Sequence, residues 1–211
     1  MNDPVQTHAY AHADFETPHQ LFIDCFHEKF PGLEINDAVL DLGCGPCDIS
    51  RRFARAYPQS TLHAVDGASN MLSHARQLNQ ENALDHRIQL IEGLLPDVSL
   101  PQSFYHTIIS NSLLHHLHHP RVLWETIQQC AKPFANIFIM DLMRPDSESS
   151  ARTLLEKYAA TEPEVLQQDF YHSLLAAFRP EEISQQLEAA GISTLQIDII
   201  SDRHMIIYGS L

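Results

Sequence analysis

The feature that most constrains this chain is an apolar run, residues 38–42, that breaks directly into two closely spaced glycines, Gly43 and Gly45. The run has the length and the β-branched residue of a buried strand, and an amphipathic stretch follows from about Asp48. Glycine accepts positive φ and lets a ligand approach bare backbone, while a helix start offers unpaired N–H groups. The stretch therefore predicts a strand, a tight glycine turn and a helix, with a ligand site at the turn.

Two carboxylates are expected beside this turn. Asp41 stands inside the first strand, two positions before Gly43, and Asp66 ends a second expected strand that begins at residue 61. Asp66 has about the spacing at which a carboxylate of the second strand meets ribose hydroxyls in nucleotide-binding sheets. A dinucleotide fingerprint would need a third glycine, and residues 51–53 supply none. The pattern therefore weakens the dinucleotide interpretation and leaves two carboxylates beside one glycine turn.

Residues 39–47, with the sequence VLDLGCGPC, and residues 63–72 resemble the first two motifs of class I S-adenosylmethionine-dependent methyltransferases. Segments 91–96, 105–117 and 183–192 are similar to later parts of the same family and follow in the same order. The resemblance covers about residues 35 to 211. It implies an α/β fold: a Rossmann-like, doubly wound seven-stranded sheet, mostly parallel, with an antiparallel C-terminal strand and helices on both faces.

The resemblance also implies S-adenosylmethionine as cofactor, with S-adenosylhomocysteine as product. Asp41 and the turn backbone would hold the methionyl end, and Asp66 the ribose. The residues expected to bind the cofactor are Tyr10, Asp41, Gly43, Cys44, Gly45, Asp66, Gly67, Met71, Gly93, Leu94, Asn111 and Ser112. One of them departs from the family pattern: Leu94 stands where many relatives have an aspartate that accepts a hydrogen bond from the adenine amino group. The backbone of Gly93 and Leu94 is then left to bind the ring edge.

Candidate catalytic residues follow the fourth expected strand, residues 105–110, where four histidines lie within residues 115–119. Ligands of a doubly wound sheet lie outside the carboxyl ends of its strands, and neutral imidazole can act as a general base near neutral pH. We expect His115, His116 and, from a later helical stretch, Tyr171 to be the catalytic candidates. Asp141 ends the fifth expected strand, at the same edge. No metal site is expected, because such closely spaced histidines cannot all face one ion.

A second interpretation of the turn comes from Cys44-Gly-Pro-Cys47, which is similar to the redox dithiol of thioredoxins. The usual tryptophan before the first cysteine is absent, since Gly43 stands there, and the chain is about twice the length of a thioredoxin domain. Cys47 is then a small residue where methyltransferases often have glycine. Two alternatives to the enzyme remain: a thiol redox protein, and a methyltransferase-like binding protein without catalysis, which the missing acidic residue at Leu94 would fit.

The charge balance bears on the partners. The chain has 13 Lys and Arg against 27 Asp and Glu, a net charge of -14, and no basic stripe. Binding to nucleic acid or to an anionic membrane rests largely on basic residues, so neither is expected. The sequence shows no apolar stretch of membrane-spanning length, no leader segment and no disulfide spacing. We therefore expect a cytoplasmic monomer or homodimer that acts on a small-molecule acceptor.

The domain organisation is expected to be simple. Residues 1–211 form a single methyltransferase domain, with residues 1–34 as an N-terminal lid segment and residues 146–178 as a helical lid insertion. In the helix after the glycine turn, three arginines are expected to lie on a solvated outer face. They are Arg51, Arg52 and Arg55.

Overall fold

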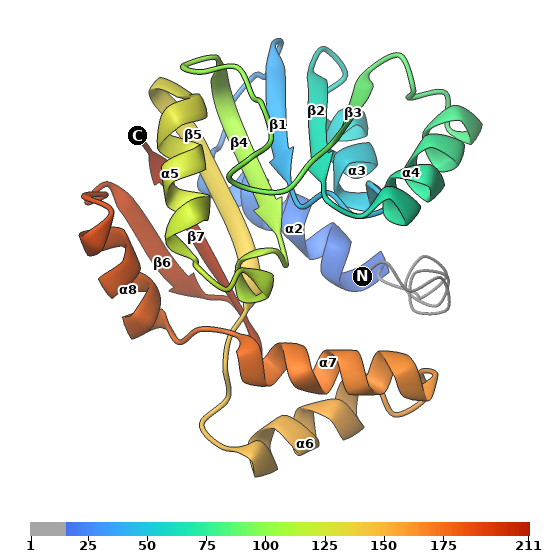
Figure 1. The fold of residues 1–211 in the computed structure, drawn as a ribbon, viewed down its shortest axis with the longest axis vertical. Coiled ribbons are helices and arrows are strands. Elements are labelled where there is room, and N and C mark those ends of the chain that lie inside the picture. Colours follow the sequence, from blue (N-terminus) through green and yellow to red (C-terminus); the bar gives the residue numbers. More distant parts are fainter. Residues whose placement is uncertain (1–15) are drawn as a thin grey trace.

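The computed structural model describes residues 16–211 and consists of one seven-stranded sheet with helices on both faces (Figure 1). The strands are β1 (Ala38–Leu42), β2 (Thr61–Asp66), β3 (Ile88–Glu92), β4 (Tyr105–Asn111), β5 (Ala131–Leu142), β6 (Leu195–Ile199) and β7 (His204–Ser210). Their order in the sheet is β3-β2-β1-β4-β5-β7-β6. Neighbours among β1 to β5 pair in parallel, and β7 runs antiparallel to both β5 and β6. The expected fold class is confirmed.

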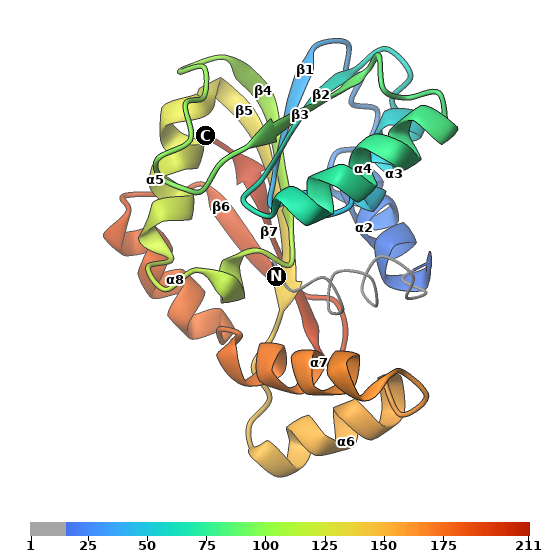
Figure 2. The same ribbon diagram turned by 45° about the vertical axis from the view of Figure 1, so that its right-hand side comes forward.

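Two helical layers cover the sheet, one on each face (Figure 2). The first contains α2 (Glu16–Lys29), α3 (Asp48–Ala56) and α4 (Ser69–Glu81), and the second contains α5 (Arg121–Cys130) and α8 (Pro180–Ala189). Side chains alternate along a strand, so Val39 packs into the first layer and Leu40 into the second. A sheet covered on both faces needs apolar residues at nearly every strand position. This requirement explains the unbroken apolar character of β1 outside Asp41.

Helix α2 belongs to the core. Phe22 and Phe26 are fully buried, and their rings lie 4.9 Å from Phe138 and 5.0 Å from Phe53, respectively. Residues 16–29 of the expected N-terminal lid segment therefore form part of a core layer, because their apolar face is needed to cover the sheet. Residues 1–15 of that segment lie outside the described part of the chain.

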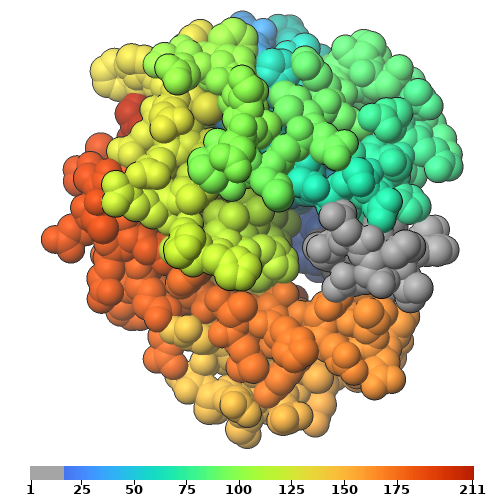
Figure 3. Space-filling model, in the orientation of Figure 1, coloured from blue at the N-terminus to red at the C-terminus, as the bar shows by residue number. Residues whose placement is uncertain are grey.

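The insertion between β5 and α8 forms a pair of helices, α6 (Glu148–Tyr158) and α7 (Glu164–Ala176). Figures 1 and 2 place this pair beyond the carboxyl ends of the strands. The pair has its own small core, and α7 contacts the 3₁₀ helix η1 (Leu114–His116) that follows β4. In Figure 3 the orange surface of α7 adjoins the yellow-green surface of the segment around η1. We call α6 and α7 the cap.

None of the helices within residues 16–211 combines the length and the apolar character needed to cross a membrane.

One arginine links the far end of α3 to the sheet. Arg87, directly before β3, donates to the carbonyl oxygens of Ala54 at 2.8 Å, Tyr57 at 2.7 Å and Ser60 at 2.6 Å. Carbonyl groups at the C-terminal end of a helix have no partner within the helix and carry partial negative charge, so a guanidinium group satisfies and stabilises them.

We expect Arg87→Ala to lower the free energy of unfolding by about 2–3 kcal/mol, because several carbonyl groups lose a charged donor at once. Urea denaturation followed by circular dichroism measures this loss. Arg121→Ala is the control, since the ion pair of Arg121 with Glu125 is exposed and such pairs contribute little. Equal effects of the two substitutions would contradict the role assigned to Arg87.

Candidate functional site

The glycine turn between β1 and α3 requires both glycines, for different reasons. Gly43 and Gly45 have φ of 75° and 51°, which favours glycine. A Cβ on Gly43 would lie 2.8 Å from the Leu113 Cβ, so close packing against the segment after β4 excludes a side chain there. A Cβ on Gly45 would meet nothing within 4 Å, so the space beside Gly45 is open. A ligand can approach bare backbone at this point.

The N–H groups of the turn are already engaged within the protein. Gly43 and Cys44 both donate to the Val65 carbonyl oxygen, at 2.8 Å and 3.0 Å, and Gly45 donates to Asp66 Oδ2 at 2.8 Å. These three N–H groups are therefore not free to bind a ligand. Their remaining polar groups are carbonyl oxygens, which are acceptors and match a ligand ammonium group.

Asp66 stands at the carboxyl end of β2 with its side chain held by two backbone groups. Besides the bond from Gly45, its Oδ1 accepts from the Ala68 N–H at 2.7 Å. The residue is half-buried. Each carboxylate oxygen has a second lone pair, so both can still accept from ligand hydroxyl groups. The Asp66 carboxylate is thus held in one orientation at the edge of the sheet, where it can accept hydrogen bonds from ribose hydroxyl groups.

An apolar surface lies next to Asp66. Leu94, in the loop after β3, is 68% exposed, and its Cδ2 lies only 2.2 Å from where a Gly67 Cβ would stand. Glycine at position 67 therefore lets the Leu94 side chain cover the turn after β2. Gly93 likewise packs closely against Val98. Met71, the expected adenine contact from α4, is only 1% exposed. Leu94 is thus the accessible apolar group at this position.

Asp41 lies beneath the turn with 1% of its surface exposed. Burial raises the pKa of Asp41 to about 7; a hydrogen bond from the Ser50 hydroxyl of α3 opposes this increase, and the charge of Asp66 adds to it. The bond between Asp41 and Ser50 ties β1 to the first turn of α3. The sequence pattern shows no sign of this partnership.

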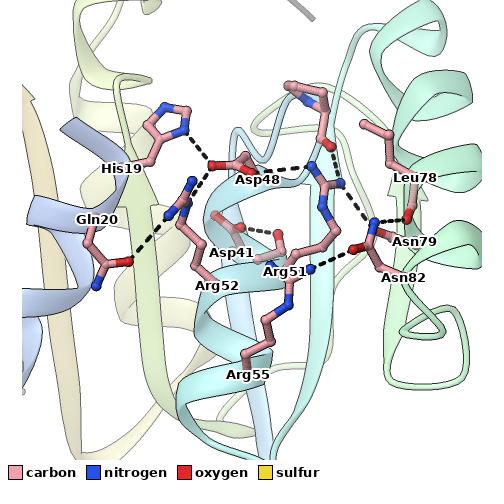
Figure 4. A network of polar contacts seen from close by, with 12 residues as sticks. His19, Gln20, Asp41, Asp48, Arg51, Arg52, Arg55, Leu78, Asn79 and Asn82 are labelled. Carbon is pink, nitrogen blue, oxygen red and sulfur yellow. Dashed lines mark hydrogen bonds and ion pairs between the residues drawn. The ribbon is translucent and has the colours of Figure 1, made fainter. Parts of the chain in front are cut away.

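A network of polar and charged side chains surrounds the glycine turn and the start of α3 (Figure 4). Asp48, the first residue of α3, accepts from His19 of α2 at 2.8 Å and from Arg52 at 2.7 Å. Partial burial opposes ionisation of Asp48, but these two donors hold the pKa of Asp48 well below its usual range. Arg51 donates to the Pro46 carbonyl oxygen of the turn at 2.7 Å and to Asn79 of α4 at 3.3 Å.

This network corrects one expectation. Arg51 is only 6% exposed, and the side chain of Arg52 is 13% exposed, whereas both were expected on a solvated face. Of the three arginines only Arg55 has an exposed position, where it bonds Asn82. Helix α4 supplies Asn79 as a partner of Arg51, and Gln20 of α2 accepts from Arg52, so these two side chains are covered by neighbouring helices.

The two cysteines of the turn are buried and do not form a disulfide. Burial raises the pKa of Cys44 well above its usual range, and contact with the Cys47 thiol adds to the increase. A thiol held neutral is a poor nucleophile, which argues against a catalytic dithiol. Cys47 has φ of 63°, in the left-handed region, so it occupies a position that favours glycine.

The carboxyl ends of β4 and β5 bring a histidine and a carboxylate together. Asp141 of β5 accepts from His115 Nδ1 at 2.5 Å, from the Leu114 N–H at 2.8 Å and from the Leu142 N–H at 2.7 Å. The side chains of His115 and Asp141 are only 3% and 2% exposed. Both residues were noted in the sequence at strand ends, but their pairing was not predicted. Asn111, the last residue of β4, and Ser112, directly after it, are half-buried and precede η1 in the chain.

The other two catalytic candidates differ in their surroundings. The His116 ring lies 4.1 Å from the His115 ring; although part of His116 is exposed, packing around its ring and the neighbouring His115 lower the pKa of His116 to about 4. Tyr171 lies on the cap, with its ring 5.0 Å from the Arg152 guanidinium and 6.0 Å from the His172 ring. Tyr10 lies outside the described residues. Within residues 16–211 no three metal-binding side chains gather.

Comparison with known proteins shows which proteins this chain resembles in sequence. Residues 39–134 match the model of a methyltransferase domain. A protein arginine N-methyltransferase, PRMT10 of Arabidopsis thaliana, is 34% identical over 102 residues, 48% of this chain and 23% of its own length. A ubiquinone biosynthesis O-methyltransferase of Xylella fastidiosa is 28% identical over 156 residues, 73% of this chain and 60% of its own. This chain therefore spans only part of these curated relatives.

Among solved structures, a SAM-dependent methyltransferase from Aquifex aeolicus has the same fold. The TM-score is 0.72 at 18% identity, and the alignment covers 99% of this chain and 98% of the other. Residues 39–134 therefore carry a methyltransferase domain, and the fold is that of the class I S-adenosylmethionine-dependent methyltransferases. The cofactor of these methyltransferases is S-adenosylmethionine.

The site described above fits that cofactor. The open space beside Gly45 admits a ligand, Asp66 presents free lone pairs for two hydroxyl groups, and exposed Leu94 offers an apolar contact. Carbonyl oxygens of the turn suit the methionyl ammonium group.

The raised pKa of Asp41 makes the stability of this protein depend on pH in a defined direction. In the unfolded chain Asp41 ionises near pH 3.8 and in the folded protein near pH 7, so its stabilising contribution is complete below pH 3.8 and is lost as the pH rises through 7. Asp41→Asn removes this loss. The free energy of unfolding of Asp41→Asn, relative to wild type, should rise by about 2–3 kcal/mol between pH 5 and pH 8.

Urea denaturation at the two pH values, without cofactor, measures the difference. Asp85→Asn is the control, since Asp85 is exposed in the loop before β3 and should show the same difference at both pH values. A pH-independent effect of Asp41→Asn would show that Asp41 is already ionised at pH 5 in the folded protein.

Proposed function

We propose that this protein transfers the methyl group of S-adenosylmethionine to a small-molecule acceptor that binds between the glycine turn and the cap. The observation that carries the proposal is convergence at one edge of the sheet. The open turn after β1, the oriented Asp66 after β2 and the polar groups at the ends of β4 and β5 all meet there. When bound, the cofactor supplies an electrophilic methyl group on a sulfonium, so the protein has mainly to align the acceptor and exclude water.

Each part of the edge has a role in this proposal. Asp66 accepts hydrogen bonds from the two ribose hydroxyls. Carbonyl oxygens of Gly43 and Gly45, with Asp41 behind them, hold the methionyl ammonium group. Leu94 contacts the adenine ring, and the backbone of Gly93 and Leu94 bonds its edge.

Charge and shape support a small acceptor. The net charge of -14 disfavours nucleic acid, because phosphate groups would be repelled. Helix α7 lies against η1, so the cap stands over the edge of the sheet where an acceptor would meet the methyl group. A lid of this kind suits a molecule that can be enclosed.

Isothermal titration calorimetry with S-adenosylmethionine and S-adenosylhomocysteine tests the cofactor site. We expect micromolar binding by wild type and an affinity lowered on the order of 100-fold in Asp66→Ala, since charge-assisted bonds to two hydroxyls are lost. Asp85→Ala, which removes an exposed carboxylate away from the site, should bind as wild type does.

The outcomes separate the interpretations. Binding that depends on Asp66, followed by formation of S-adenosylhomocysteine with an acceptor, supports the enzyme. Binding without turnover of any acceptor in a broad screen favours a binding protein. Absence of binding by folded, reduced protein would overturn the proposal.

A further inference from the structure

The pairing of His115 with Asp141 defines the state of the imidazole. Asp141 already accepts from two backbone N–H groups, and a carboxylate can only accept. In a bond of 2.5 Å to that carboxylate, His115 Nδ1 therefore carries the hydrogen, and in the neutral imidazole Nε2 keeps its lone pair. Among residues 16–211 no group bonds Nε2, and Nε2 is not one of the polar atoms sealed in the interior without a partner. His115 thus presents a basic nitrogen at the edge of the sheet.

We propose that His115 is the general base of this methyltransferase, that Asp141 positions it, and that the acceptor is therefore a compound methylated on a hydroxyl oxygen. This inference rests on the proposed function. An amine in its neutral form or a thiolate needs no base before attack, whereas a phenol, enol or alcohol must lose its proton. A buried imidazole that is oriented by a carboxylate can remove the proton that a hydroxyl acceptor must lose.

The step balances without a further reagent. The hydroxyl oxygen forms a bond to the methyl carbon, and the carbon–sulfur bond of the cofactor breaks with its electron pair going to sulfur. The hydroxyl proton moves to His115 Nε2 and later to water. His115 becomes an imidazolium for a moment, and the Asp141 carboxylate stabilises that charge.

The groups around His115 favour this proton transfer. His116, beside it on η1, is neutral at pH 7 and adds no positive charge. Asp169 of α7 acts on His116 with its negative charge. On the far side, His204 of β7 lies in register with Leu142, and burial, with the nearby Arg203, lowers the pKa of His204 to about 4. His115 therefore has the neutral imidazole of His116 beside it and the carboxylate of Asp141 bonded to it, and neutral His204 lies near Asp141.

A second histidine–carboxylate pair in the same protein is a natural control. His106 Nδ1 and Asp37 Oδ2 also lie 2.5 Å apart, but the His106 side chain is 52% exposed. This pair lies at the amino ends of β4 and β1, at the opposite edge of the sheet. His106→Gln removes the same kind of bond as His115→Gln without touching the proposed site.

The experiment measures release of S-adenosylhomocysteine from S-adenosylmethionine with probe acceptors at saturating cofactor. The probes are phenol, catechol and 4-nitrophenol as hydroxyl compounds, benzylamine as an amine and thiophenol as a thiol. We expect turnover of a hydroxyl probe, with kcat lowered about 100-fold or more in His115→Gln and unchanged in His106→Gln. For both variants the dissociation constant of S-adenosylhomocysteine, measured by calorimetry, should stay within about twofold of the wild-type value.

Two further readouts separate a base from a merely structural residue. The loss in His115→Gln should be much smaller for 4-nitrophenol at pH 8, because this acidic phenol is already largely ionised. Asp141→Asn should lower kcat with little change in KM, and the low-pH limb of the wild-type kcat profile should be absent in His115→Gln. In wild-type protein without cofactor, ¹⁵N spectra of labelled histidine should show His115 with hydrogen on Nδ1 only at pH 8.

Several results would overturn the proposal while leaving the cofactor site intact. These are equal turnover by His115→Gln and wild type, turnover of only the amine or the thiol, no turnover of any hydroxyl probe by protein that binds the cofactor, or a His115 spectrum with hydrogen on Nε2. Failure to bind S-adenosylhomocysteine in wild type would instead overturn the proposed function on which this inference rests.

Discussion

The carboxylate of Asp66 joins the turn after β1 to the turn after β2, the two turns from which we propose the cofactor site is built. It accepts the Gly45 N–H of the first turn and the Ala68 N–H of the second, at 2.8 Å and 2.7 Å. Because a carboxylate oxygen can accept more than one hydrogen bond, the same group can hold the protein together and still receive a ligand. Loop position and ligand binding therefore depend on one side chain.

The rest of the turn is arranged so that buried polar groups have partners. Asp41 accepts from Ser50, and the three N–H groups of the glycine turn donate to Val65 and Asp66. Outside, Arg51 satisfies the Pro46 carbonyl oxygen, and its own burial is offset by Asn79 and Asp48. Leaving one of these buried polar groups without a partner would cost more free energy than its hydrogen bond contributes to stability. The turn is thus held by paired polar groups while the space beside Gly45 stays open.

The histidine–carboxylate pair at the ends of β4 and β5 follows the same principle. Asp141 is almost fully buried, and three donors converge on it, so its position is determined by backbone as well as by His115. Parallel pairing places Asn111 of β4 beside Met140 of β5, which brings the two strand ends, and the groups that follow them, to one point. Side chains distant in sequence thereby become neighbours at the edge that the cap overlies.

The sequence by itself determined the sheet, the glycine turn and the position of Asp66. Each of these follows from local chemistry: continuous apolar runs for strands covered on both faces, and glycine where φ is positive. Only the tertiary structure decided which groups become partners. The burial of Arg51 between α3 and α4, the core position of α2 and the bond between His115 and Asp141 all join residues far apart in the chain. Periodicity identifies the face on which a residue lies, but the partner that meets it there depends on how the layers pack.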